Sequence, residues 1–275
     1  MRLKQPFPER YGAWALVAGA SEGIGAAFAY SLARRGMNLV LAARRVEPLT
    51  ELAEKLRAEF GQSGLQILCL NGDLGSPDFL ESLAATCSTL DLGLLIYNAA
   101  HSPIGEFVDL PVADVLRVVD VNVRGPVTLV HALLPQMKAR GRGGVILLSS
   151  LASMTGAPRV ATYAASKAFN RILAQALWYE MKDSNIDVMA CCPTATRTPG
   201  YRAAADKDPP GTLEPEQVAE EALDGLGRGP VLIPGRFNRV ADVFMSRVLS
   251  RKRAILIMGD NTSALVQAKP PKGSS

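Results

Sequence analysis

A tyrosine and a lysine four residues apart, Tyr163 and Lys167, are the side chains whose types and spacing best suit catalysis. If the chain is helical from residue 161 onward, both lie on one face, a turn apart. An ammonium beside a phenol favours the phenolate and lowers a pKa that starts near ~10 toward the working range of a general acid-base. Ser150, just after an apolar run, could hydrogen-bond a developing oxyanion, although a helix cap is the alternative role for a lone serine. The three side chains together predict proton transfer to a carbonyl oxygen.

A glycine-rich stretch near the amino terminus, VAGASEGIG at residues 17–25, fits two different turns. Read from Gly19 through Ser21 to Gly23, it matches the strained strand-to-helix turn that exposes a serine for acyl transfer. Read through Gly19, Gly23 and Gly25, it is a turn whose bare backbone lets a pyrophosphate approach a helix N-terminus. Both interpretations need a strand before the turn and a helix after it.

Histidine placement separates these two interpretations. A serine hydrolase built on this turn needs a histidine base that follows both the serine and an acid along the chain. The two histidines are His101, in a loop after an expected strand, and His131, within the apolar helical run LVHALL. The nucleotide-binding turn is therefore favoured, and a serine hydrolase is kept as an alternative.

Short apolar runs separated by helix-length segments make up most of the chain. Near-continuous apolar strands are typical of parallel sheets buried on both faces. Their alternation with helices predicts an α/β fold, a Rossmann-like doubly wound parallel sheet with helices on both faces and right-handed crossovers. Ligands bind such sheets beyond the carboxyl ends of the strands. The seven expected strands lie at residues 14–17, 38–42, 65–70, 92–97, 144–149, 186–192 and 230–234.

Two arginines, Arg44 and Arg45, follow the second expected strand. Dinucleotide sites usually carry an Asp or Glu there for the adenosine ribose, whereas an arginine accommodates a 2'-phosphate. Because a guanidinium pairs well with phosphate, the sequence predicts NADP(H) in preference to NAD(H). Two solvated arginines are the alternative.

Composition and charge restrict the possible partners. The 275 residues carry a net charge of +4 from 30 basic and 26 acidic residues, mostly interspersed, so no nucleic-acid-binding face is expected. No apolar run approaches the ~18 residues of a membrane span, and the first ten residues lack a secretory signal, which predicts a cytoplasmic protein. No metal site is expected, because the cysteine spacing is not that of a zinc site. Apolar surroundings predict four buried thiols, at Cys69, Cys87, Cys191 and Cys192.

The last third of the chain breaks the strand-helix rhythm. Residues 198–215 are rich in Pro, Ala and charge and are too long for a routine connection, which predicts a lid over the site. A terminal helix is expected at 238–253, packed through an apolar stripe, with a membrane-surface helix as the alternative. A single domain is expected over 1–266 and a disordered tail over 267–275. The stripe consists of Val240, Val243, Phe244 and Val248.

These motifs together resemble the short-chain dehydrogenase/reductase family, in its classical subgroup, over residues 14–234. Asn122 in VNV completes the family's catalytic tetrad with Ser150, Tyr163 and Lys167. Asp73 in GDL, Asn98 in YNAA, and Pro193 and Thr198 in CCPTATRT also match family motifs. The cofactor site that the resemblance implies consists of Gly19, Ser21, Glu22, Gly23, Ile24, Gly25, Arg44, Arg45, Asp73, Leu74, Asn98, Ala99, Tyr163, Lys167, Pro193, Thr196 and Thr198.

The resemblance also implies the role of each tetrad residue. Tyr163 donates the proton, and Ser150 orients the substrate carbonyl. Lys167 holds the nicotinamide ribose and lowers the pKa of the tyrosine, while Asn122 supports a water that relays protons to Lys167. The implied activity is hydride transfer between NADP(H) and a ketone, aldehyde or secondary alcohol. The implied assembly is a homodimer or homotetramer built on helices near 112–140 and 161–183.

Three positions depart from the family pattern: Ala18 replaces a threonine, and Ala100 and Thr194 replace glycines. The first change removes a hydroxyl that ties two loops together, and the others narrow the available backbone conformations. These changes leave the tetrad intact. A non-catalytic NADPH-binding sensor or scaffold of the same fold is kept as the alternative function, although the complete tetrad argues against it. The apolar stripe and the scarcity of charges near the tetrad favour an apolar or bulky carbonyl substrate.

Overall fold

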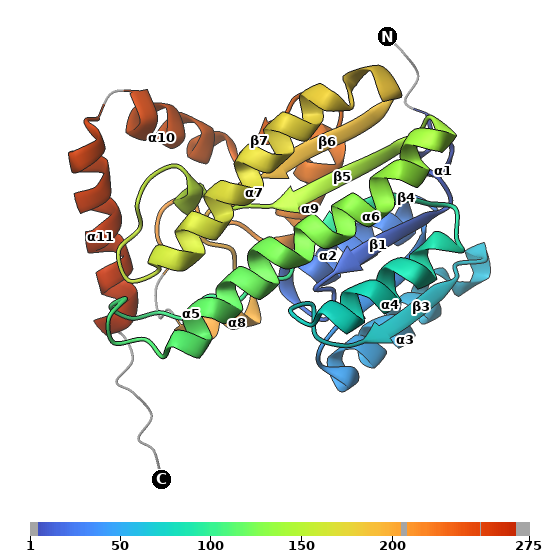
Figure 1. Cartoon of the computed structure of the whole chain (residues 1–275), viewed down its shortest axis with the longest axis horizontal. Helices are drawn as coiled ribbons and strands as arrows, with labels where there is room; N and C mark the ends of the chain where they lie inside the picture. Colours follow the sequence, from blue (N-terminus) through green and yellow to red (C-terminus); the bar gives the residue numbers. More distant parts are fainter. Residues whose placement is uncertain (1–4, 205–207, 248, 268–275) are drawn as a thin grey trace.

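A seven-stranded parallel sheet forms the centre of the molecule (Figure 1). The computed structural model describes residues 5–204, 208–247 and 249–267. The strand order β3-β2-β1-β4-β5-β6-β7 reverses direction between β1 and β4, which confirms the predicted doubly wound, Rossmann-like fold. The strands are β1 (Trp14–Ala18), β2 (Asn38–Ala43), β3 (Ile67–Asn71), β4 (Leu92–Tyr97), β5 (Gly143–Leu148), β6 (Ile186–Cys191) and β7 (Val231–Leu232).

Helices cover both faces of this sheet, because successive strand side chains point to opposite sides. Val17 packs in one core with α2, α3 and α9, whereas its neighbour Leu16 packs in the other core with α4, α6 and α7. Both side chains are fully buried, and each such burial contributes roughly 1.5–3 kcal/mol. The helices are α1 (Phe7–Tyr11), α2 (Gly23–Arg34), α3 (Val46–Phe60), α4 (Pro77–Ser88), α5 (Val112–Val119), α6 (Gly125–Arg140), α7 (Ala161–Glu180), α8 (Pro199–Ala204), α9 (Pro215–Gly225), α10 (Arg236–Arg247) and α11 (Arg251–Gln267).

The third strand differs from its prediction. β3 begins at Ile67 rather than at residue 65, and Leu68 and Cys69 on it are exposed. The expectation of a buried thiol at Cys69 was therefore wrong, whereas the other three cysteines are buried. The physical reason is that β3 is the edge strand of the sheet, so fewer elements cover its side chains.

The carboxyl-terminal region also differs from its prediction. The single helix expected at 238–253 is instead two helices, α10 and α11, which lie along one end of the molecule (Figure 1). The apolar stripe does not pack: Val240, Val243 and Phe244 are exposed, with Val240 71% accessible. The side of α10 that packs carries a buried polar residue, Asn238. The stripe therefore gives no support for an apolar substrate.

The expected lid and tail lie partly within the described residues. The segment expected to form a lid begins with α8 and ends where α9 begins. Residues 205–207 of the expected lid, residue 248 of the apolar stripe and residues 268–275 of the expected tail lie outside the described residues. Within the described ranges, none of the helices combines the length and apolar character needed to span a bilayer.

Candidate active site

The glycine-rich turn after β1 is closed by backbone contacts that exclude side chains. The carbonyl of Gly19 accepts a hydrogen bond of 2.8 Å from Asn98 Nδ2 on the loop after β4. A Cβ at Gly25 would lie 2.0 Å from the same carbonyl oxygen, and a Cβ at Gly19 would lie 2.6 Å from the amide nitrogen of Ala99. Glycine at both positions therefore lets α2 begin directly against the turn.

Two of the three departures from the family pattern affect this turn little. Although Ala18 has no hydroxyl, its carbonyl accepts hydrogen bonds of 2.9 Å from the amides of both Asn98 and Ala99, so the two loops remain tied. Ala100 replaces a glycine without strain, because the non-glycine residues with positive φ among those described are Arg159 and Asn185. Thr194, the third departure, also replaces a glycine without backbone strain, because its φ is not positive.

A cavity of about 520 Å³ opens beside the turn, at the carboxyl ends of β1, β2, β3 and β4. Most of the predicted cofactor-site residues line it, whereas Gly25, Tyr163, Lys167, Pro193 and Thr196 do not. The predicted residues that line it are Gly19, Ser21, Glu22, Gly23, Ile24, Arg44, Arg45, Asp73, Leu74, Asn98, Ala99 and Thr198. The lining residues that the sequence did not indicate are Ala43, Ala100, His101, Arg117, Val121 and Gly200.

The two arginines after β2 have different environments. Arg45 forms an ion pair of 2.7 Å with Glu22 and lies 3.5 Å from Ser21 Oγ. Arg44 is exposed and lines the cavity. Bare backbone, guanidinium groups and hydroxyls around one cavity suit a ligand that carries phosphate and ribose.

Ser21 is not placed for the serine-hydrolase alternative. Its hydroxyl lies against the Arg45 guanidinium. His131 lies on α6, which covers the opposite face of the sheet from α2, the helix that follows Ser21. The His101 ring lies 3.4 Å from Asp114 on α5. These positions do not present a histidine to Ser21 as its general base.

Asp73 and Arg117 form a charged pair in the lining of the cavity. Arg117 Nη2 donates to both carboxylate oxygens of Asp73, at 3.0 and 2.9 Å. Burial acts to raise the pKa of Asp73, but hydrogen bonds from the amide of Gly75 and from Arg117 outweigh it and hold the pKa below its ordinary value. Asp73 is therefore a carboxylate at neutral pH. No sequence signal marked Arg117, because α5 follows β4 and only the strand order brings it to the end of β3.

Asn122 lies fully buried in a π-helical turn, Asp120–Arg124, between α5 and α6. Its amide pairs with the backbone of His101, accepting from the amide at 2.8 Å and donating to the carbonyl at 3.0 Å. A second donation, of 3.0 Å, reaches Ser166 Oγ, which in turn donates to the carbonyl of Tyr163. The carbonyl of Asn122 accepts from Asn170. A π turn thus interrupts the helix expected at 112–140, at the predicted tetrad position.

Ser150, Tyr163 and Lys167 meet beyond the carboxyl end of β5. Ser150 lies near enough to Tyr163 for its hydroxyl to lower the pKa of the phenol, and Ser150 Oγ accepts from the amide of Ala152 at 3.1 Å. Lys167 Nζ lies 5.5 Å from the centre of the Tyr163 ring and donates to the carbonyl of Leu148 at 2.7 Å. Tyr163 and Lys167 thus lie one turn apart on α7, as predicted.

Burial sets the protonation of these groups. Burial raises the pKa of Tyr163 above its ordinary value, and the hydrogen bond with Ser150 opposes that rise only in part. Burial also lowers the pKa of Lys167 to about 8. The expectation that the tyrosine has a lowered pKa is therefore not met in this structure, because desolvation outweighs the favourable contacts of the phenolate. At neutral pH, Tyr163 is a protonated phenol.

The segment after β6 links the tetrad to the glycine-rich turn. The carbonyl of Pro193 accepts a hydrogen bond of 2.9 Å from the amide of Leu151, which follows Ser150. Thr196 is buried and bridges to Leu213. A Cβ at Gly23 would lie 2.7 Å from Thr198 Cγ2, so this segment ends against the turn. The predicted residues of this segment therefore lie between the tetrad and the cavity.

Comparisons with known proteins agree with this geometry. Residues 13–209 match the family described as short chain dehydrogenase. A 7beta-hydroxysteroid dehydrogenase of Clostridium sardiniense is 35% identical over 236 residues, which cover 85% of this chain and 89% of that protein. A structure from a study of 7beta-hydroxysteroid dehydrogenase stereoselectivity superposes with a TM-score of 0.86 at 29% identity, over 92% of this chain and 99% of that one.

A second solved structure is a complex with NADPH. The short-chain dehydrogenase from Sphingobium yanoikuyae in complex with NADPH has a TM-score of 0.74 and 30% identity, over 95% of this chain and 98% of that one. The family match, the sheet order and the relatives lead to one conclusion. The chain belongs to the short-chain dehydrogenase family of oxidoreductases.

Proposed function

We propose that the protein is an NADP(H)-dependent oxidoreductase that moves hydride between C4 of the nicotinamide and a ketone, aldehyde or secondary alcohol. The observation that carries the proposal is the grouping of Ser150, Tyr163 and Lys167 beyond the end of β5, with Lys167 Nζ 5.5 Å from the centre of the Tyr163 ring. This cluster lies at the same sheet edge as the cavity that the glycine-rich turn borders. A carbonyl oxygen between the two hydroxyls would have one proton donor and one stabilising donor.

The cofactor, when bound, supplies or accepts the hydride, and the protein supplies position and protons. Tyr163, kept protonated by burial, donates its phenolic proton to the carbonyl oxygen. Ser150 donates a hydrogen bond to the same oxygen as charge develops on it. Lys167 places an ammonium near the phenol, and at neutral pH a pKa of about 8 leaves most of it charged. Asn122 holds the loop at His101 against α7 through Ser166.

The preference for NADP(H) rests on the two arginines after β2. We expect the variant with both Arg44→Ala and Arg45→Ala to lose about 10- to 100-fold of its preference for NADPH over NADH, because a hydrogen bond to a charged group contributes roughly 1.5–3 kcal/mol. Kd values for both cofactors, from fluorescence titration, measure this. Arg34→Ala is the control, because Arg34 is an exposed arginine that pairs with Glu220. Equal loss for both cofactors would show that the arginines do not read the 2'-phosphate.

The experiment that tests the proposed activity is oxidation of NADPH and NADH with a panel of aliphatic, aromatic and steroid ketones. The steroid arm is motivated by the 7beta-hydroxysteroid dehydrogenase relatives. Turnover of any carbonyl with NADPH supports the proposal, and the active carbonyl defines the substrate class. If NADPH binds but no carbonyl is reduced and no alcohol oxidised with NADP+, the sensor alternative is favoured. A cytoplasmic location stays a prediction.

We also propose that the chain forms a homodimer or homotetramer through α5 and α7. Three apolar residues at helical spacing on α5 are exposed, Val112, Leu116 and Val119, and Phe169 and Ile172 on α7 are exposed as well. Covering such a stripe removes apolar area from water, and a stable interface needs about 800 Å² per partner.

Leu116→Asp is expected to shift the protein to a monomer, because a buried carboxylate at an apolar interface has no partner. Light scattering measures the mass of the wild type and of the variant. Val46→Asp is the control, since Val46 is a half-exposed apolar residue on α3, which covers the other face of the sheet. A monomeric wild type would rule out the assembly.

A further inference from the structure

Asn238, near the start of α10, is a buried polar residue with no role in the reaction described above. Asn238 is only 2% exposed, although the outward face of its helix carries apolar side chains. A buried amide is retained only where its hydrogen bonds are satisfied. The hydrogen bonds of the Asn238 side chain therefore indicate why an amide is buried there.

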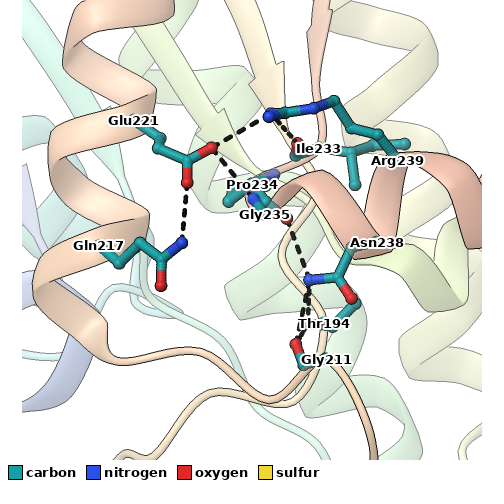
Figure 2. A network of polar contacts seen from close by, with 9 residues as sticks. All are labelled: Thr194, Gly211, Gln217, Glu221, Ile233, Pro234, Gly235, Asn238 and Arg239. Carbon is teal, nitrogen blue, oxygen red and sulfur yellow. Dashed lines mark hydrogen bonds and ion pairs between the residues drawn. The ribbon is translucent and has the colours of Figure 1, made fainter.

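The amide nitrogen of Asn238 joins three segments that are separate in the sequence. Nδ2 lies 3.0 Å from each of three acceptors: Thr194 Oγ1, the carbonyl of Gly211 and the carbonyl of Pro234 (Figure 2). Thr194 Oγ1 itself donates to the Gly211 carbonyl at 2.8 Å. The donors run in one direction, from Asn238 to Thr194 to Gly211, and the two N–H groups of Asn238 are shared among three acceptors.

Space for this amide is created by a glycine. A Cβ at Gly211 would lie 2.1 Å from Asn238 Oδ1, and Gly211 has a φ of +85°. The backbone thus approaches the amide more closely than any side chain allows. Thr194, which stands where the family pattern has a glycine, supplies the hydroxyl in the middle of this chain of donors.

The opposite side of the same corner is held by Glu221 on α9. Glu221 Oε2 accepts from the amide of Gly235 at 3.0 Å and from Arg239 Nη1 at 3.1 Å (Figure 2). Arg239 also donates to the carbonyl of Ile233. These contacts join the start of α10, which carries Asn238, to α9.

The segments that Asn238 joins border the predicted reaction site. Thr194 follows Pro193, whose carbonyl accepts from the amide next to Ser150. Gly211 lies two residues before Leu213, whose amide donates to the carbonyl of Ala195 and whose carbonyl accepts from Arg197. The end of the segment expected to form the lid is thus attached to the loop beside the tetrad, and Asn238 spans the attachment.

We propose that Asn238 and Thr194 form a clamp that positions the Ser150 loop and the end of the 198–215 segment relative to each other on the substrate side. Asn238 is a positioning residue, because it acts through Thr194 and Pro193 rather than on substrate. The inference rests on the proposed oxidoreductase activity and deepens it. The clamp holds the end of the segment at Gly211, whereas Thr198 and Gly200, which line the cavity at the glycine-rich turn, lie at its start.

The variant that tests the clamp is Asn238→Asp, which keeps the size of the side chain and replaces its donor with an acceptor. A carboxylate would face three oxygens, so the clamp opens. We expect KM for the carbonyl found in the panel to rise about three- to tenfold or more, as loss of a hydrogen bond with an unsatisfied partner implies. The Kd for NADPH is expected to change less than this KM, because Asn238 bonds Thr194 and Gly211, and neither residue lines the cavity at the glycine-rich turn. Thr194→Val should act in the same direction, Thr194→Ser should retain wild-type KM, and the double variant Asn238→Asp with Thr194→Val should fall short of the product of the single effects.

The control is Gln217→Ala, because exposed Gln217 donates to Glu221 in the same corner rather than to Thr194 or Gly211. Hydrogen exchange gives a readout independent of turnover: the amides of Leu151 and Leu213 should lose protection in Asn238→Asp and not in Gln217→Ala. If wild type reduces no carbonyl, the proposed activity fails while exchange still tests the clamp. Unchanged KM and unchanged protection at both amides, or an equal loss of substrate and cofactor binding, would overturn the clamp.

Discussion

Replacing Tyr163 by phenylalanine is expected to reduce carbonyl reduction by about 10²- to 10⁴-fold, the usual contribution of a general acid. The change removes one oxygen and keeps the ring, so α7 and its packing remain. NADPH should bind as tightly as to the wild type, since Tyr163 does not line the cavity beside the glycine-rich turn. Single-turnover oxidation of bound NADPH, followed by absorbance, measures the chemical step directly.

Tyr179→Phe is the matched control for this experiment. Tyr179 lies on the same helix and is 63% exposed, so the same loss of a hydroxyl should leave turnover unchanged. A Tyr163→Phe enzyme that keeps more than about a tenth of wild-type turnover would contradict the assignment of Tyr163 as the acid, because general acid catalysis contributes at least ~10²-fold.

Ser150→Ala is expected to lower kcat by about 10²- to 10³-fold, as loss of one oxyanion donor does in other enzymes. It should also move the pH profile. The hydrogen bond from Ser150 lowers the pKa of Tyr163, so its removal raises that pKa further. Alcohol oxidation needs the phenolate, and its rise with pH should therefore shift to higher pH in the variant. Carbonyl reduction needs the phenol, and its alkaline decline should shift in the same direction.

The measurement is kcat/KM against pH in both directions of the reaction, for wild type and variant. Ser88→Ala serves as the control, since Ser88 is an exposed serine at the end of α4 that bonds only a local carbonyl. Loss of the Ser150 cap to Ala152 costs about 1 kcal/mol, which a thermal melt detects separately. A variant with an unaltered pH profile would show that Ser150 does not tune the tyrosine.

The sequence predicts the fold well for the central strands, because a strand that is buried on both faces has a continuous apolar run. The run LGLLIY forms the central strand β4, which is buried along its whole length, and the apolar run alone predicts that burial. Prediction failed at the margins. β3 is exposed at Leu68 because it is an edge strand, and the α10 stripe at Val240 faces solvent because the helix packs through its other side.

The pKa of the tyrosine shows a different limit. The spacing of Tyr163 and Lys167 correctly placed both on one helix face, since helical geometry is local. The direction of the pKa shift depends on desolvation by everything packed around the phenol, and that environment comes from several elements.

By itself the sequence determined the parallel sheet, the glycine-rich turn and the candidate tetrad. Each depends on residue types and spacings within one strand, one turn or one helix, whose conformations follow from local physical chemistry. Only the tertiary structure decided that Arg117 pairs with Asp73 and that Asn238 binds Thr194. Both pairs are 44 residues apart, and their side chains meet because strand order and helix packing carry them together.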